Sequence, residues 1–512
     1  MVEILPLENL EGLVYPEALA GLKAYLGNVR KGYDEMLETP FSKGNPREQA
    51  TFLYETVAKS SIPELNELEQ DEVERFGPYS VRLPWSDRKP GVLEYFIPRH
   101  NSSGMPPRAN LSRLSRLLPA HSIYPLSFEA SFDRMPKDSN LGLPAFSSDK
   151  KFYPDYLERA NDLKAGGYRE KLLPAILGWR GQASGDPDHP KQRVVWMMDH
   201  LETIVGLSVQ IPLLERLRGM MSFAAWNDLS VVDRIITALI DSSPSEIMSA
   251  DYSGFDKRAS LESIQDTFSL IRYWCVHSAS NQIDWLEESF LDVGLVTPDG
   301  IFTGKVGAVC SGSALTNFVD SIIQLLMIVD LVSKATVLGD DGVYTGTPGQ
   351  DVMSQTLRDR YGVEVSSDKG GFSKNQVLYL QRLHLRHWRR GGICVGIRSL
   401  IRSLNSICHL ERLTPGLHPA FFSARAISII ENSRNHPRFR IAVKWLYDND
   451  ELMRKYDPMV LFRLAGGAGF VEKKLGLDSF RFGRELPSVG LNEFATVKIL
   501  RELKSRTNRN AT

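Results

Sequence analysis

The segment KATVLGDDGVYTGT, residues 334–347, places the tetrad Gly339, Asp340, Asp341 and Gly342 between two runs rich in β-branched residues. Asp-Asp-Gly between two strand-like runs predicts a tight β-hairpin. Two adjacent carboxylates repel each other, and a turn needs at most one of them. A divalent cation would explain the second. Taken alone, the tripeptide fits a solvated turn better, because Gly-Asp-Asp occurs by chance in roughly one chain in ten of this length.

A second pair of carboxylates, Asp251 and Asp256, lies upstream in EIMSADYSGFD, residues 246–256. We expect Asp251 at the end of a strand and Asp256 past the next turn, near the start of a helix. Alone, the pair fits a strand end and a helix cap. With Asp340 and Asp341 it predicts a magnesium site, because Mg²⁺ takes a few carboxylates and relies on water and substrate phosphates for the rest. Two such ions, roughly 3.5–4 Å apart, would activate an attacking oxygen and stabilise a leaving one.

The segment GAVCSGSALTNFVDS, residues 307–321, separates the two acidic blocks. Its glycines and serines, including Ser311 and Gly312, predict a flexible loop, and the apolar spacing that follows predicts a long helix. Thr316 and Asp320 lie one helical turn apart, on a polar row that could hydrogen-bond a sugar, while the helix N-terminus favours a phosphate. A serine that merely caps the helix is the alternative, and it is compatible with a ligand role.

In order and spacing, these blocks resemble the motifs of viral RNA-dependent RNA polymerases. Motif A, D-x4-D, is matched by Asp251 and Asp256; motif B, S-G-x3-T-x3-N, is matched by Ser311, Gly312 and Thr316; and motif C, G-D-D, is matched by Gly339, Asp340 and Asp341. The motif B asparagine is replaced by Asp320, in a pattern similar to that of the picobirnavirus and partitivirus group of double-stranded RNA viruses. The resemblance implies that Asp256 and Asp320 are acceptors around the ribose 2′-hydroxyl. Asn317 is the alternative reader of that hydroxyl.

The resemblance extends upstream of motif A. KQRVVW at 191–196 is similar to the basic motif F, which implies that Arg180, Lys191 and Arg193 hold the incoming triphosphate. All three side chains only donate hydrogen bonds and are almost always charged. Without the resemblance, a solvated basic loop would explain these three residues equally well. NLGLPAF at 140–146 is similar to motif G, which implies that Leu143 and Pro144 lie along the template.

Two further motifs follow motif C. Residues 359–372 are similar to motif D, in which Lys369 would protonate the departing pyrophosphate, and residues 377–385 are similar to the motif E hairpin, which grips the primer. A run from Lys374 to Arg402 contains seven Lys or Arg residues and no acidic residue, so it could follow a phosphate backbone. A solvated face is the alternative. The arginines expected to contact template or primer are Arg382, Arg386, Arg389 and Arg390.

The resemblance implies an α+β right-hand polymerase fold with fingers, a palm built on an antiparallel sheet, and a thumb, in a closed, encircled form. We expect the fingers at 1–245, with motif G at about 140–146 and motif F at about 180–196. The palm is expected at 246–385, with a finger insertion at about 259–305, and the thumb and tail at 386–512.

The implied activity is template-directed RNA synthesis from ribonucleoside triphosphates, replicating and transcribing a viral double-stranded RNA genome. The implied cofactor is a pair of Mg²⁺ ions, with Mn²⁺ able to replace them, and the implied partners are template and nascent RNA and the viral capsid protein. A reverse transcriptase-like polymerase is one alternative, although such enzymes usually carry a bulky aromatic where this chain has Asp256. A non-enzymatic protein that binds RNA or the capsid is the other, and it would leave the carboxylates unexplained.

Composition agrees with this interpretation. The apolar content is 42% and the charged content is 24%, which is ordinary for a globular protein. The net charge is −1, so an RNA-binding surface has to come from basic residues that cluster in one part of the protein. The four cysteines are scattered without C-x2-C pairs, which argues against a zinc site and a disulfide framework. The sequence shows no signal peptide and no membrane-spanning segment, so we expect the virion interior or host cytoplasm and no membrane partner.

Overall fold

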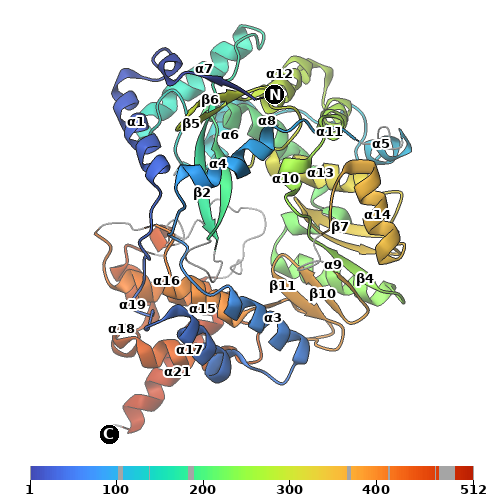
Figure 1. The fold of residues 1–512 in the computed structure, drawn as a ribbon. Coiled ribbons are helices and arrows are strands. Elements are labelled where there is room, and N and C mark those ends of the chain that lie inside the picture. Colours follow the sequence, from blue (N-terminus) through green and yellow to red (C-terminus); the bar gives the residue numbers. More distant parts are fainter. Residues whose placement is uncertain are drawn as a thin grey trace.

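The computed structural model describes residues 2–101, 108–137, 139–182, 190–365, 371–412, 416–467, 469–471 and 490–510. Helices surround three β-sheets, so the protein has the expected α+β composition. In the view of Figure 1, a five-stranded sheet lies at the top, a four-stranded sheet at the right, and the C-terminal helices at the lower left. Lys369 lies outside the described residues.

The four-stranded sheet carries the acidic blocks. Its order is β7-β8-β4-β9, with every neighbouring pair antiparallel, and its strands are β4 (Ile247–Ala250), β7 (Lys334–Leu338), β8 (Asp341–Thr345) and β9 (Gly371–Ser373). The hairpin expected around Gly339 is therefore confirmed as β7 and β8. The strands are short and rich in β-branched and apolar residues, as expected for a buried sheet.

Alternating side chains attach this sheet to two different cores. Ile247 and Val343 pack on one face against α9 (Leu229–Ser242). Met248 and Tyr344, the next residue of each strand, point to the opposite face and join the largest core. That core includes α13 (Thr316–Ile328), which is buried along nearly its whole length. A sheet covered on both faces holds its strand ends rigidly, and the acidic residues lie at those ends.

The five-stranded sheet gathers distant parts of the chain. Its order is β1-β6-β5-β2-β3, in which β2 and β5 are parallel and the other pairs are antiparallel. The long β2–β3 hairpin extends from this sheet toward the C-terminal helices (Figure 1). The strands are β1 (Glu3–Leu5), β2 (Ala175–Gln182), β3 (Lys191–Met197), β5 (Leu295–Thr297) and β6 (Gly300–Thr303). The helices around it and the main core are α1 (Pro16–Lys31), α4 (Trp85–Leu93), α5 (Arg108–Ser115), α6 (Phe128–Arg134), α7 (Tyr153–Ala165), α8 (His200–Leu217), α10 (Phe255–Arg258), α11 (Leu261–Trp274), α12 (Ser280–Asp292) and α14 (Gln350–Tyr361).

The third sheet confirms the hairpin expected at residues 377–385. Strand β10 (Gln376–Tyr379) pairs antiparallel with β11 (Arg382–Leu385), and β12 (Ile397–Arg398) adds a third strand. Leu380 and Gln381 form the two-residue turn with φ angles of 51° and 60°. Two consecutive positive φ values belong to a type I′ turn, which matches the twist of an antiparallel pair.

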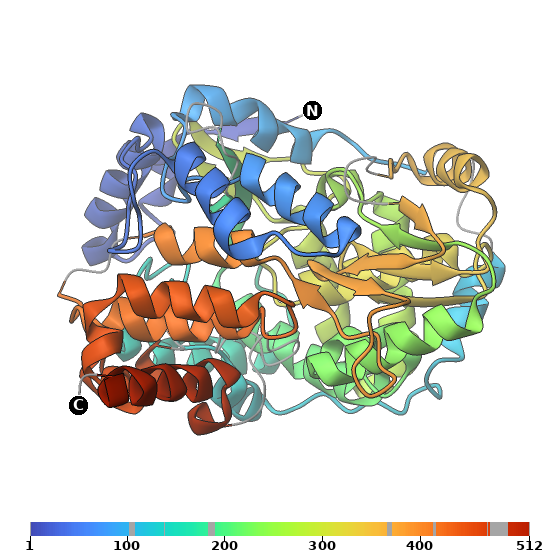
Figure 2. The same cartoon turned by 90° about the horizontal axis from the view of Figure 1, so that it is seen from below.

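The C-terminal helices form a core of their own, together with a part of the N-terminal region. Helices α2 (Pro46–Leu53) and α3 (Pro63–Glu74) lie beside α15 (Leu400–Cys408), and Figure 2 shows the blue N-terminal helices next to the orange ones. The expected division placed residues 1–245 together in the fingers. In the structure, residues 41–76 share a hydrophobic core with the C-terminal helices. The remaining helices there are α16 (Ala420–Glu431), α17 (Phe439–Asn449), α18 (Glu451–Lys455), α19 (Pro458–Leu464) and α21 (Ala495–Asn510).

Glu69 of α3 fixes this association. Its carboxylate, which is fully buried, accepts hydrogen bonds from the Ser399 hydroxyl and from the amides of Leu400 and Ile401, at 2.7–2.9 Å. These are free N–H groups of the first turn of α15, which a carboxylate satisfies well. No periodicity in the sequence indicates this long-range cap.

Candidate active site

The sheet register brings motifs A and C together. Ala250 of β4 lies opposite Gly342 of β8, so Asp251 follows the strand end directly beside the motif C turn. In the β7–β8 hairpin Leu338 pairs with Asp341, which leaves Gly339 and Asp340 at the tip. Gly339 has a φ of +60°, a conformation that glycine adopts without strain. The structure therefore places Asp251, Asp340 and Asp341 at one edge of the sheet.

Helix α13 holds the hairpin tip in place. The Ser321 hydroxyl accepts a hydrogen bond from the Gly339 amide at 2.8 Å, and the Gln324 side-chain amide donates to the Asp340 carbonyl at 2.9 Å. Both residues are fully buried. Sequence reasoning missed them, because one apolar helical face was the visible signal and these polar side chains lie outside it.

The chemistry of the donors at this edge suits a hard divalent cation. Carboxylate oxygens are the ligands that Mg²⁺ prefers, and substrate phosphates and water complete its coordination. The charge of Asp340 raises the pKa of both Asp256 and Asp320, so these carboxylates repel one another. Within the described ranges, no three His, Cys, Asp or Glu side chains already converge into a group able to hold a metal. The edge thus offers oxygens of the kind that such a cation prefers.

Asp320 is buried and Asp256 is half-buried, and the two lie near each other behind the strand ends. Burial, and then the charge of Asp340, raises the pKa of Asp256 to about 6, although nearby Arg193 opposes this effect. Asp320 is only 3% exposed, and burial followed by the charges of Asp256 and Asp340 raises its pKa well above the usual value. Its Oδ1 atom has no hydrogen-bond partner among the described residues. A carboxyl that keeps its proton donates as well as accepts, as asparagine does, whereas the sequence interpretation treated Asp320 as an acceptor only.

Asn317, the alternative reader of the sugar, has a different environment. Its Oδ1 accepts a hydrogen bond from the indole N–H of Trp226 at 3.0 Å. Its Nδ2 faces Gly339, where an added Cβ would lie 3.4 Å away. The charge of Asp256 raises the pKa of Asp320, which places these two carboxyl groups near each other.

The motif B loop lies against strand β3. The Ser311 hydroxyl donates to the Val194 carbonyl at 2.6 Å. A Cβ on Gly312 would lie 1.7 Å from the Trp196 carbonyl oxygen, so this contact admits only glycine. The Thr316 hydroxyl donates to the Cys310 carbonyl and closes the loop onto the helix. Ser311 and Thr316 thus already have partners in the protein, and they shape the loop.

The basic residues expected to hold the triphosphate share one face of the β2–β3 hairpin. Arg180 of β2 lies directly opposite Arg193 of β3, and Lys191 comes two residues before Arg193 in β3, so all three side chains point to one side. Arg180 is 63% exposed and forms an ion pair at 3.8 Å with Glu411, from the C-terminal region. Arg193 is close enough to Asp256 to lower its pKa.

The structure does not support direct RNA contact by Leu143 and Pro144. Leu143 is fully buried in a core with α1, and Pro144 is also buried. The Leu143 carbonyl accepts from the Tyr156 hydroxyl at 3.0 Å, and the Pro144 carbonyl accepts from the Tyr15 amide at 3.0 Å. Both residues hold the motif G loop from inside and leave no surface for a template.

The expected primer-contacting arginines also bind within the protein. Arg382 is 5% exposed and donates to the Gly396 carbonyl, so it too lacks a surface for RNA. Arg386 donates to two backbone carbonyls, and Arg390 donates to Asn435. Arg389 forms a two-bond ion pair with Asp241, which neutralises its charge. Sequence alone could not distinguish this use of arginine from phosphate binding.

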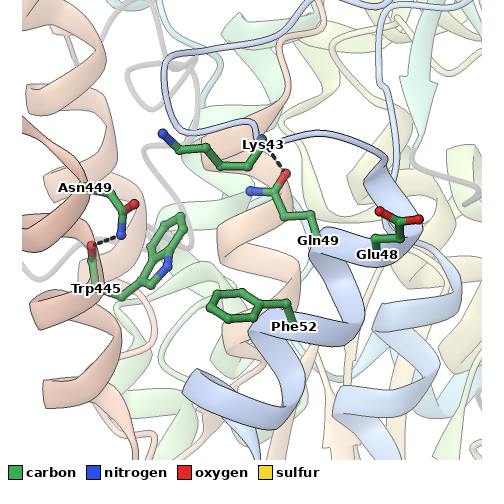
Figure 3. A pocket seen from close by; sticks show the side chains of 6 residues that line it. All are labelled: Lys43, Glu48, Gln49, Phe52, Trp445 and Asn449. Atoms are coloured by element: carbon green, nitrogen blue, oxygen red, sulfur yellow. Dashed lines mark hydrogen bonds between the residues drawn. The ribbon is translucent and has the colours of Figure 1, made fainter.

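One surface pocket lies away from these motifs, between α2 and α17 (Figure 3). Its volume is about 350 Å³. Its lining contains a single carboxylate, Glu48, so it adds nothing to the chemistry of the strand ends. The lining residues are Lys43, Glu48, Gln49, Phe52, Trp445 and Asn449.

Comparison with known proteins agrees with the arrangement of motifs. Residues 214–384 match the family model for viral RNA-dependent RNA polymerase. The chain is 30% identical over 451 residues to a potential RNA-dependent RNA polymerase of human picobirnavirus, a match that covers 81% of this chain and 83% of the relative.

Solved structures give the same result for the fold. The crystal structure of a human picobirnavirus RNA-dependent RNA polymerase superposes with a TM-score of 0.81 at 24% identity, covering 98% of this chain and 100% of the other. Its insertion-loop deletion mutant superposes with a TM-score of 0.79 at 23% identity over the same shares.

The fold and the motifs define a right-hand α+β polymerase. The chain belongs to the viral RNA-dependent RNA polymerases, within the group of the picobirnaviruses, which have double-stranded RNA genomes. It is thus an RNA-directed nucleotidyltransferase. Across the part of the chain that the structure describes, no helix is both long and apolar enough to cross a membrane.

Proposed function

We propose that this polymerase replicates and transcribes a viral genome by joining ribonucleoside triphosphates on an RNA template with the help of two divalent ions. The observation that carries the proposal is the register of β4 and β8, which puts Asp251 beside Asp340 and Asp341. These three carboxylates would hold Mg²⁺, or Mn²⁺ in its place. When bound, the ions supply charge stabilisation and activation of the primer 3′-hydroxyl.

The chain's own residues position the substrate. Arg180, Lys191 and Arg193 form a basic face that neutralises the triphosphate, as in other phosphoryl-transfer sites. Lys369, in motif D, is proposed to protonate the leaving pyrophosphate. General acid catalysis of this kind is typically worth about 10²–10⁴-fold.

Sugar selection is proposed to rest on the carboxyl pair of Asp256 and Asp320. Asp256 and Asp320 lie together behind the strand ends, and one of them keeps a proton more readily than an ordinary carboxyl. Such a pair can both donate to and accept from a ribose 2′-hydroxyl. Ser311, Gly312 and Thr316 give the adjoining loop its shape, and Asn317 lines the motif C turn.

An encircled form is supported by contacts between the β2–β3 hairpin and the C-terminal region. Arg180 pairs with Glu411, and the Gly181 amide donates to the same carboxylate at 3.4 Å. Arg412 donates to the Trp179 carbonyl at 3.4 Å. We therefore retain the division into fingers, palm and thumb as a proposal, with residues 41–76 counted with the thumb. A capsid partner and a place inside the virion or the host cytoplasm rest on the resemblance to the family.

The decisive experiment is ribonucleotide incorporation on an RNA template with Mg²⁺, comparing wild type with Asp340→Ala. The exposed Asp351→Ala in the first turn of α14 is the matched control, since it removes a carboxylate away from the strand ends. We expect Asp340→Ala to abolish incorporation while the control keeps it. More than a few per cent of activity in Asp340→Ala would contradict the metal-site assignment. Parallel reactions with deoxyribonucleotides test the reverse-transcriptase alternative.

A further inference from the structure

A buried glutamate on α8 contacts the motif B loop just beyond the residues that contact β3. Glu202 is 2% exposed. Its Oε1 accepts a hydrogen bond from the Ser313 hydroxyl, and its Oε2 accepts from the Ala314 amide at 3.3 Å. Ser313 in turn accepts from the Leu315 amide at 3.1 Å. A single carboxylate thereby satisfies two of the donors at the point where the loop becomes helix α13.

The packing around Glu202 leaves the loop little freedom. Gly206, one turn further along α8, lies so close that a Cβ there would be 3.0 Å from the Ala314 side chain. Earlier in the loop, Gly312 abuts the Trp196 carbonyl and Ser311 bonds to Val194. The loop is thus attached to both β3 and α8. Loss of the Glu202 carboxylate would remove one of these two attachments.

The first turn of α8 also contacts the motif G loop. The His200 amide donates to the Leu141 carbonyl at 3.1 Å, and Gly142 abuts the Met198 carbonyl. Asp199, which caps α8 through the Leu201 amide, is buried in a two-bond ion pair with Arg159 at 2.8 and 3.1 Å. One rigid turn of helix therefore joins motif G to motif B and directly follows motif F.

We infer that Glu202 is a positioning residue for the motif B loop, and that through it the first turn of α8 sets the ribose preference of the polymerase. This inference rests on the proposed role of the motif B region in sugar selection. This role requires no contact between Glu202 and the substrate. Glu202 fixes the loop that leads into α13, the helix that carries Asp320, and a displacement of about 1 Å can cost a reaction about 10²-fold.

The test uses the full chain and compares Glu202→Ala with Glu202→Gln. The alanine variant loses both acceptors. The glutamine variant keeps one oxygen for the Ala314 amide, and its NH₂ can donate to the Ser313 hydroxyl, so both contacts survive. We expect the ratio of ribonucleotide to deoxyribonucleotide incorporation efficiency to fall about tenfold in the alanine variant, the order of one lost hydrogen bond. The glutamine variant should stay near wild type.

Glu431→Ala is the matched control. Glu431 is 1% exposed and accepts three hydrogen bonds, one more than Glu202, but its partners are the first residues of α21, in the C-terminal helices. The control should lower thermal stability without changing the sugar ratio. If it changes the ratio as much as Glu202→Ala does, general destabilisation explains the effect and the inference is overturned.

A second readout does not depend on activity. Hydrogen exchange of the backbone amides in residues 307–316 should become faster in Glu202→Ala, because the Ala314 amide loses its acceptor, and should stay unchanged in Glu431→Ala. Unchanged exchange would refute the positioning role. Faster exchange with an unchanged sugar ratio would refute the link to sugar selection. If the wild type fails to incorporate nucleotides at all, the proposed function fails, while the exchange result still decides whether Glu202 holds the loop.

Discussion

Substituting Gly312 by alanine gives the sharpest test of how closely the motif B loop fits against β3. The added Cβ would lie 1.7 Å from the Trp196 carbonyl oxygen, so that separation has to grow to at least 3.0 Å. Neither strand β3 nor the motif B loop can move easily. Trp196 is fully buried and pairs with Leu177 of β2, while the loop is attached through Ser311 to Val194.

The required movement therefore exceeds 1 Å in a segment that leads directly into α13. A misplacement of this size typically costs about 10²-fold in rate, whereas overpacking of a core costs about 1–3 kcal/mol of stability. We expect Gly312→Ala to reduce single-nucleotide incorporation by about 100-fold and to lower the free energy of unfolding only modestly. Rapid-quench kinetics and urea denaturation measure the two quantities.

Gly21→Ala is the control for this experiment. Gly21 lies within α1 with no neighbouring atom within 4 Å of an added Cβ, and alanine is the better helix former. This variant should be as stable as wild type or slightly more so, with unchanged incorporation. The reasoning is refuted if Gly312→Ala incorporates nucleotides at close to the wild-type rate, because the loop would then tolerate a shift that the structure forbids.

Three further predictions follow from buried carboxyl groups. Asp320→Asn should retain the ribonucleotide preference in a competition assay, since asparagine matches a protonated carboxyl, whereas Asp320→Ala should lower it; a lowered ratio in both would contradict the donor role. Glu69→Ala should reduce the free energy of unfolding by about 3 kcal/mol or more in urea titrations, because it strands the donors at the start of α15; a change below about 1 kcal/mol would contradict the cap. Burial raises the pKa of Glu202 from 4.5 to about 7. Because the unfolded chain loses this proton first, the free energy of unfolding falls as pH rises from about 4.5 to about 7, on the order of 3 kcal/mol in total. Glu202→Gln lacks this titration, and its melting temperature relative to wild type should therefore rise between pH 5 and pH 8; a constant difference would contradict the raised pKa.

The sequence predicted those features that depend on short stretches of chain. The turn at Gly339, the strand before Asp251, the helix after Thr316 and the hairpin at 377–385 each carry their own turn or periodicity signal. The order of the motifs then allowed the family to be predicted, and the comparisons confirm it.

Contacts between distant segments could not be predicted from the sequence. Glu202 and Glu69 look like ordinary helix-surface carboxylates in the sequence, yet both are buried and bind backbone donors more than a hundred residues away. The basic run between Lys374 and Arg402 shows the opposite case, in which a visible sequence signal was misleading. Its charge pattern suggested RNA binding, whereas residues such as Arg382 and Arg389 donate hydrogen bonds to carbonyls and carboxylates of the protein itself.

The shared core of α2, α3 and the C-terminal helices has a consequence for the order in which the molecule is made. Glu69 and Ser399, which bond directly, are 330 residues apart in the chain. At a synthesis rate of about 5–20 residues per second, roughly 20–60 s pass on the ribosome between the appearance of one partner and that of the other. During that interval the apolar faces of the N-terminal helices lack the surface that later buries them. A chaperone that binds nascent chains would therefore find its longest-lived target in residues 41–76.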